Sequence, residues 1–187
     1  MSKFKSNLVW IDLEMTGLND DNVILEIATL ITDGDLEILD EGPCIAIHRS
    51  TTELSTMEAW SLKHHTESGL LQRVSESNIS LQDAEKLTIQ FLSRWVKIGE
   101  APLCGNSVHI DRRFLRKEMP LLEQYLHYHI IDVSSVKQLA RRWYPNLKEP
   151  EKKREHLALA DIRESVEELR WYRDNIFQQI NKNNHEQ

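Results

Sequence analysis

The hydrophobic and polar positions of the first fifty residues form short apolar runs separated by polar turns. Apolar and β-branched residues cluster at 8–14, 23–32 and about 36–47, and the turn-rich stretches LNDDN and DGD lie between them. Each run has the length of a strand, and the connections are short enough for antiparallel pairing. The pattern therefore predicts a meander of three strands at the start of the chain.

The later part of the chain alternates between helical periodicity and short apolar runs. A helix is expected over 80–97, capped by Ser80 and Asp83, because apolar residues recur there at spacings of three and four. Further strands are expected at 101–106 and 129–133. The remaining predicted helices begin at about 111, at Pro120, and after a cap at Ser134 or Ser135, the last of these stopping near Tyr144–Pro145.

A long amphipathic helix is expected over 157–180, after a charged loop at 148–155. Residues 181–187 are predicted to be a frayed tail, so residues 1–180 would form one domain. Three strands followed by alternating helices and strands predict an α/β domain with a mixed sheet. This order suits a ribonuclease H-like sheet of five strands flanked by helices, although order alone does not select that fold.

Composition places the chain among soluble globular proteins, with 40% hydrophobic and 28% charged residues in 187. No apolar stretch approaches the roughly 20 residues that span a bilayer, and the N-terminus lacks the apolar segment of a signal peptide. Cys44 and Cys104 are too few for a disulfide framework and lack a metal-type spacing. We therefore expect a cytoplasmic protein without a membrane partner.

The charge balance narrows the possible partners. The formal net charge is −7, from 23 Lys and Arg against 30 Asp and Glu. Proteins that grip long nucleic acids through their phosphates usually present a basic surface, because each neutralised phosphate releases counterions. The acidic balance favours a nucleic-acid substrate with few phosphates over a long nucleic acid.

The first predicted strand contains two acids within an apolar run, VWIDLEMTGL at 9–18. Side chains alternate along a strand, so Asp12 and Glu14 share one face with Trp10, while the flanking apolar residues share the other. A solvated face of an amphipathic strand explains these residues at least as well as function does. Two carboxylates at this spacing can also bind one hard cation such as Mg²⁺ or Mn²⁺.

Three further residues, considered together, favour a cation site over a solvated strand face for Asp12 and Glu14. Asp111 follows a short predicted strand, Asp161 lies at the start of the last predicted helix, and His156 precedes Asp161 by five residues. Five helical residues turn through about 500°, so His156 would reach the same site from the preceding loop or first turn. Each residue alone has a plainer explanation: a helix cap for Asp111, a helix-dipole partner for Asp161, a surface histidine for His156.

Four segments resemble the oligoribonuclease family, in the histidine branch of the acidic-quartet (DEDD) 3′→5′ exonuclease superfamily. The segments are VWIDLEMTGL (9–18), EIATL (26–30), CGNSVHIDRRFL (104–115) and HLALADIRESVEEL (156–169). The ordered set of D-x-E, a middle Asp and H-x-x-x-x-D is specific for the superfamily. IDLEMTGL with GNSxxxDRRFL is more specific for oligoribonuclease, and the likeness covers nearly the whole chain.

The resemblance implies a metal-dependent hydrolase of very short RNA, from dinucleotides to about five nucleotides. Two divalent cations, Mg²⁺ or Mn²⁺, would be held by four carboxylates, and His156 would be the general base; the carboxylates are those of Asp12, Glu14, Asp111 and Asp161. Such a metal pair activates a water and stabilises the leaving oxygen. Histidine in general can accept a proton near neutral pH.

The resemblance also implies a substrate slot closed at one end, in a homodimer. Leu18 would pack against the bases, Trp60 would stack on one, and His65 would lie close to the substrate. Ser107 and Ser134 would bind the 5′ phosphate, and the partner subunit would contribute Tyr128. From the sequence alone, core packing is the favoured explanation for Trp60 and Tyr128.

Two positions depart from the family pattern. His129 stands where the family usually has Arg after the stacking tyrosine, and an imidazole offers phosphate a weaker and less constant charge than a guanidinium. This substitution puts the strength of the phosphate contact in doubt. His109–Ile110 replace the usual Gly-Gln before Asp111. For His109, a hydrogen-bonded position behind the metal ligands or a surface position is favoured over metal ligation.

Three other functions fit parts of the sequence. A sibling exonuclease that proofreads DNA or trims structured RNA would share the metal site and differ in substrate. A non-catalytic oligonucleotide-binding protein is disfavoured, because such a protein has no use for negative charge facing phosphate. A hydrolase of small nucleotide diesters is the third, and it overlaps with the hydrolase of very short RNA because a linear dinucleotide is itself a short RNA.

Overall fold

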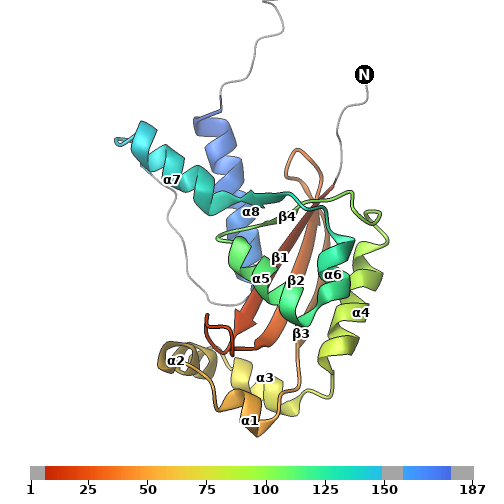
Figure 1. Ribbon diagram of the computed structural model, residues 1–187. Helices are drawn as coiled ribbons and strands as arrows, with labels where there is room; N and C mark the ends of the chain where they lie inside the picture. Colours follow the sequence, from red (N-terminus) through yellow and green to blue (C-terminus); the bar gives the residue numbers. More distant parts are fainter. Residues whose placement is uncertain (1–6, 149–157, 178–187) are drawn as a thin grey trace, which may run out of the picture.

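The computed structural model describes residues 7–148 and 158–177, and in them five strands form one mixed sheet (Figure 1). The strand order is β3-β2-β1-β4-β5. The strands are β1 (Leu8–Met15), β2 (Ile24–Thr32), β3 (Ile38–Ala46), β4 (Leu103–Gly105) and β5 (Ile130–Asp132). β1 to β3 pair antiparallel, whereas β4 and β5 run parallel to β1. The predicted five-stranded α/β fold and its antiparallel meander are confirmed.

Helices cover both faces of this sheet, which places β1 between two hydrophobic cores. Val9 and Ile11 of β1 pack into the core beneath α4 (Leu81–Leu92), α5 (His109–Glu118) and α6 (Pro120–Tyr125). Trp10 points the other way, into the core beneath α7 (Val133–Trp143) and α8 (Ala158–Asn175). The period-two alternation of β1 is therefore buried on both sides along its first half.

Three short helices lie near the end of the sheet where β1 stops (Figure 1). They are α1 (Thr51–Leu54), α2 (Ala59–Glu67) and α3 (Leu70–Glu76), and the pattern of the sequence did not predict them. α1 begins with a capping box between Ser50 and Glu53. With so few buried residues, these helices give weak amphipathic patterns, which explains why periodicity missed them.

Two predicted helix boundaries are wrong for identifiable reasons. The helix expected over 80–97 begins after the Ser80 cap as predicted but ends at Leu92, because the chain turns beyond Ser93 although Trp95 still packs on the core. The helix α7 is capped by Asp132, not by Ser134 or Ser135. A carboxylate oxygen of Asp132 accepts the backbone N–H of Ser134 at 3.0 Å.

The last helix confirms the predicted apolar face, formed by Ala158, Ile162, Val166 and the partly buried Leu169. It ends at Asn175, short of the predicted end at 180, because the chain turns at residues 176 and 177. Apart from Lys148, the charged loop expected at 148–155 and the tail expected at 181–187 lie outside the described residues. Among the helices of the described ranges, none combines the length and apolar character needed to cross a membrane.

Candidate active site

Two carboxylates of the candidate site come from the second half of β1. Asp12 and Glu14 lie on the same face of the strand as Trp10, as the alternation predicted, and this face is covered by α8. Both acids are partly buried. Asp12 faces Ala28 and Glu14 faces Glu26 across the antiparallel pairing with β2. The central position of β1 therefore holds both acids on a rigid, hydrogen-bonded frame.

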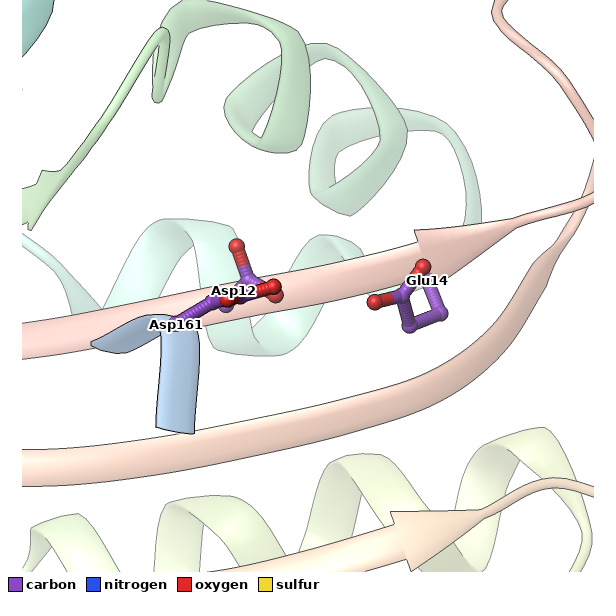
Figure 2. A group of neighbouring side chains, drawn as sticks. All are labelled: Asp12, Glu14 and Asp161. Carbon is purple, nitrogen blue, oxygen red and sulfur yellow. The ribbon is translucent and has the colours of Figure 1, made fainter. Parts of the chain in front are cut away.

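The third carboxylate comes from the first turn of α8, which packs on β1 and β2. Ligand oxygens of Asp12, Glu14 and Asp161 all lie within 4.8 Å of one another. Figure 2 shows Asp161 extending from the start of the helix towards Asp12, with Glu14 further along the strand. Residues almost 150 positions apart in the sequence thus converge as the spacing of motifs suggested.

The fourth acid, Asp111, lies in the first turn of α5 and is buried. Because β4 runs parallel to β1, the helix that follows β4 begins at the end of the sheet where β1 finishes. Asp111 accepts the backbone N–H of Leu13 at 3.0 Å, so its carboxylate is anchored to the strand between Asp12 and Glu14. It does not cap α5; Val108 occupies that position.

Burial, together with the charges of nearby acids, raises the pKa values of the carboxyl groups in this site. Burial, then the charges of Asp111, Glu14 and Asp161, raises the pKa of Asp12 well above its ordinary value. Burial and the charges of Asp161, Glu26 and Asp111 raise the pKa of Glu14 to about 8. Burial raises the pKa of Asp111 to about 7, against the opposing effect of the Leu13 N–H.

The donor set fits hard divalent cations. Carboxylate oxygens are the ligands that Mg²⁺ and Mn²⁺ prefer, and several acids gathered in a partly buried place repel one another unless a cation or a proton neutralises them. Burial, followed by this repulsion, raises the pKa values of Asp12 and Glu14. A cation bound here would therefore relieve the electrostatic repulsion between the carboxylates.

His65 lies beside this cluster on α2. It is buried, one ring nitrogen lies 2.8 Å from the carbonyl oxygen of Met15, and the other lies 3.8 Å from the carboxylate of Glu14. Burial lowers the pKa of the His65 imidazole. The structure thus brings His65 to the carboxylates, whereas His156, the predicted base, lies outside the described residues.

Ser107 and Ser134, expected at the phosphate, lie together beyond the end of β4. Their hydroxyl oxygens are 3.1 Å apart, and one carboxylate oxygen of Asp132 accepts both backbone N–H groups. Both serines line a cavity of about 550 Å³. Its other lining residues are His109, Asp132, Ser135, Gln138, Leu139 and Arg142.

The remaining predicted residues are on the surface. Trp60 on α2 is 62% exposed and Leu18 is 52% exposed, so core packing does not account for either. Tyr128 is 75% exposed, and its ring contacts those of His127 and His129. His109 is exposed too, 3.7 Å from the Asp132 carboxylate, in agreement with the surface position, one of the two favoured for it.

Comparison with known proteins supplies the family. Residues 9–169 match the exonuclease family RNase_T. An oligoribonuclease of Photorhabdus laumondii is 54% identical over 95% of this chain and 99% of its own length. The chain belongs to the oligoribonuclease family. An oligoribonuclease of Klebsiella pneumoniae is 53% identical over 94% of this chain and 98% of that protein, and membership identifies this chain as a nuclease of the hydrolase class.

Solved structures confirm the ribonuclease H-like fold at much lower identity. Exonuclease I of Methylocaldum szegediense is 16% identical and gives a TM-score of 0.67 over 91% of this chain. Escherichia coli exonuclease I, solved with a 5cy-dT13 oligonucleotide, is 12% identical with a TM-score of 0.67 over 92% of this chain. In both cases this chain spans only 41% of the larger protein, so the likeness concerns the exonuclease fold alone.

Sequence reasoning missed one ion pair, between the buried Glu26 and the partly exposed Arg73, that adjoins this oligoribonuclease-family site. Glu26 on β2 faces Glu14 on β1 and is only 2% exposed. Its carboxylate accepts a hydrogen bond from the Arg73 guanidinium at 2.8 Å. The charge of Glu26 raises the pKa of Glu14 and that of Arg73 lowers it. The signal was present in EIATL: an acid in an otherwise apolar strand implies a buried partner.

Proposed function

We propose that this chain is a 3′→5′ exoribonuclease that hydrolyses very short RNA, dinucleotides especially, to nucleoside 5′-monophosphates. The observation that carries the proposal is the convergence of Asp12, Glu14 and Asp161 within 4.8 Å, beside the buried Asp111. Family membership selects nuclease chemistry for this acidic cluster. The acidic net charge of −7 agrees with a substrate that has few phosphates.

Two divalent cations, Mg²⁺ or Mn²⁺, are the cofactors that these acids suit. Asp12, Glu14 and Asp161 would supply most of the ligand oxygens, with Asp111 on the adjoining side. When bound, the cations would lower the pKa of an attacking water and stabilise charge on the leaving 3′ oxygen. The rigid strand and the two helix starts would keep the oxygens in place between turnovers.

Proton transfer is assigned to His156. It precedes Asp161 by five residues in the sequence. The family resemblance gives it the role of general base. His65 is held by the Met15 carbonyl and lies next to Glu14, where it would contact the substrate and exclude water. His65 is buried, so its imidazole is less suited than an accessible one to exchange protons with solvent.

Selection of short substrates would come from groups at both ends of a slot. One face of the Trp60 indole stacks on His64 at 3.9 Å between ring centroids, and the exposed side chain offers its other face to a base. Leu18 would pack against the same nucleotides. The terminal 5′ phosphate would be held by Ser107, Ser134 and His129. A third nucleotide would then have no favourable path beyond the closed end of the slot.

A homodimer is supported by an apolar surface along the edge strand β5 and helix α7. Tyr128 is 75% exposed and Trp143 is 66% exposed, and Ile130 and Leu139 are exposed on the same edge and helix. Exposed aromatic residues at an unpaired sheet edge are typical of subunit contacts. A second copy of this chain would cover them and would bring Tyr128 of the partner subunit to the substrate. We place the enzyme in the cytoplasm.

A time course on labelled RNA of two, three, five and ten nucleotides, with Mg²⁺ or Mn²⁺, tests the proposal. We expect the rate to fall as the RNA lengthens, with little cleavage of a DNA oligomer of equal length. Asp12→Asn is the matched inactive control. Equal rates on all lengths, or preference for long RNA or DNA, would identify a sibling exonuclease instead.

A further inference from the structure

The loop that follows β1 carries Leu18 directly from the carboxylate strand. Thr16 closes its base: the Thr16 N–H donates to the carbonyl of Val23 at 3.0 Å, and the Thr16 hydroxyl accepts the N–H of Val23 at 3.0 Å. Within the loop, the side-chain oxygen of Asn22 accepts the N–H of Asn19 at 2.7 Å. The loop therefore has a defined conformation although Leu18 itself is exposed.

Glu58 connects this loop to the helix that carries Trp60. It occupies the N-cap position of α2, yet its side chain makes no capping hydrogen bond. Instead the Glu58 N–H donates to the Thr16 carbonyl at 2.8 Å. Its carboxylate oxygen Oε1 accepts the Leu18 N–H at 3.2 Å and the side-chain amide of Asn19 at 2.8 Å. A residue that could stabilise its own helix is used on the neighbouring loop.

Gly17 makes this close approach possible. A Cβ at Gly17 would lie 2.4 Å from the Glu58 Oε1 atom and 2.6 Å from the side-chain oxygen of Asn22. Any larger residue would push the carboxylate away from the Leu18 N–H. The absence of a side chain at Gly17 thus lets the Glu58 carboxylate reach the Leu18 N–H.

The opposite side of the loop is held by α5, the helix that carries Asp111. The Arg113 guanidinium donates to the Leu18 carbonyl, and the Lys117 ammonium donates to the carbonyls of Asp20 at 2.6 Å and Asn22 at 2.8 Å. These bonds fix the loop relative to the carboxylates. Glu58 adds the link to α2, which the α5 bonds do not supply.

We propose that Glu58 is a positioning residue that sets the distance between Leu18 and Trp60, the two walls of the base-binding slot. The inference rests on the proposed function, in which both walls contact the substrate. Glu58 does not reach the reacting atoms; it acts through the Leu18 loop. Its loss would weaken the binding of dinucleotides and leave the chemical step in place.

The geometry predicts which property of Glu58 matters. Both side-chain bonds end on one oxygen atom, so the loop needs an acceptor at that place rather than a negative charge. Glu58→Gln keeps an acceptor oxygen, whereas Glu58→Ala removes it. We expect Glu58→Ala to raise the KM for a dinucleotide about tenfold, as the loss of two hydrogen bonds implies. The kcat should stay within about twofold, and Glu58→Gln should restore the KM.

Two controls separate this role from a general structural effect. Glu67→Ala removes the same charge from the other end of α2, at an exposed residue, and should leave the KM unchanged. Gly17→Ala should reproduce the KM increase of Glu58→Ala with the Glu58 carboxylate still present. An unchanged KM in Glu58→Ala, or a Glu58→Gln as impaired as the alanine variant, would overturn the proposal.

Amide hydrogen exchange tests the link without any activity measurement. The Leu18 N–H should exchange faster in Glu58→Ala than in the wild-type protein and at the wild-type rate in Glu58→Gln. Equal exchange in all three would refute the link whatever the substrate proves to be. A wild-type enzyme that fails to cleave dinucleotides would refute the proposed function, while the exchange data would still decide whether Glu58 holds the loop.

Discussion

The carboxylate centre and the proposed base-binding slot are built in opposite ways. Asp12 and Glu14 lie on the central strand of the sheet, whose first half is buried between two cores, and Asp111 is bonded to the same strand. Leu18 and Trp60 lie on exposed segments held largely by polar contacts. Folding of the core therefore brings the acids together, whereas the proposed selection of substrates would depend on a few surface bonds that can vary independently.

The largest effect should follow from breaking the carboxylate centre. Asp161→Asn removes one of three converging carboxylates, and we expect dinucleotide hydrolysis to fall at least about a hundredfold, since even outer residues of metal sites cost that much. The metal-free protein should melt higher, by about 2–4 °C for each 1 kcal/mol of relieved repulsion. Asp174→Asn, an exposed change on the same helix, is the control. Retained activity would remove Asp161 from the site.

The stabilisation of the carboxylate centre by cations should depend on pH. The pKa values of Glu14 and Asp111 are raised to about 8 and about 7 in the folded protein, above unfolded values of about 4. Their contribution to the stability of the metal-free protein is therefore full below about pH 4 and is lost as the pH rises through 7 to 8. Cations that replace these protons should raise the melting temperature more at pH 8 than at pH 5.5.

Thermal unfolding with EDTA and with millimolar Mg²⁺ or Mn²⁺ measures this difference. Asp161→Asn should show a smaller metal-induced rise at pH 8 than the wild-type protein, because one ligand oxygen donor has lost its charge. An equal rise at both pH values would show that cations bind elsewhere.

A substitution in the proposed slot should weaken substrate binding and leave the rate of the chemical step nearly unchanged. Trp60→Ala removes a stacking surface worth about 1–3 kcal/mol, so the dinucleotide KM should rise about tenfold or more with little change in kcat. Leu62→Ala, at another exposed position of α2, is the matched control. A proportional fall in kcat would show that the two regions are coupled rather than independent.

The smallest effect is expected at the phosphate end. His129→Arg introduces a permanent charge and a planar fork, so a 5′-phosphorylated dinucleotide should bind up to about fivefold more tightly, the range of exposed charge pairs. A dinucleotide that lacks the 5′ phosphate should show no gain. If both dinucleotides respond alike, His129 does not contact the terminal phosphate.

The same contrast explains what could be predicted from the sequence. Alternation in VWIDLEMTGL determined the faces of β1 correctly, because burial on both sides makes its pattern strict. The order of the elements that were predicted was also correct. The helices α1 to α3 were missed, since an exposed surface imposes no strict period. Glu58 and Arg73 were missed because each acts through a partner far away in the sequence, which no local pattern reveals.

The most direct test of the central claim is anomalous diffraction from crystals grown with Mn²⁺. The account predicts manganese peaks within ligand distance of the carboxylate oxygens of Asp12, Glu14 and Asp161, with a second ion close by, and loss of these peaks in Asp161→Asn. Crystals that bind manganese elsewhere, or that show no peak between β1 and the start of α8 at saturating metal, would contradict it.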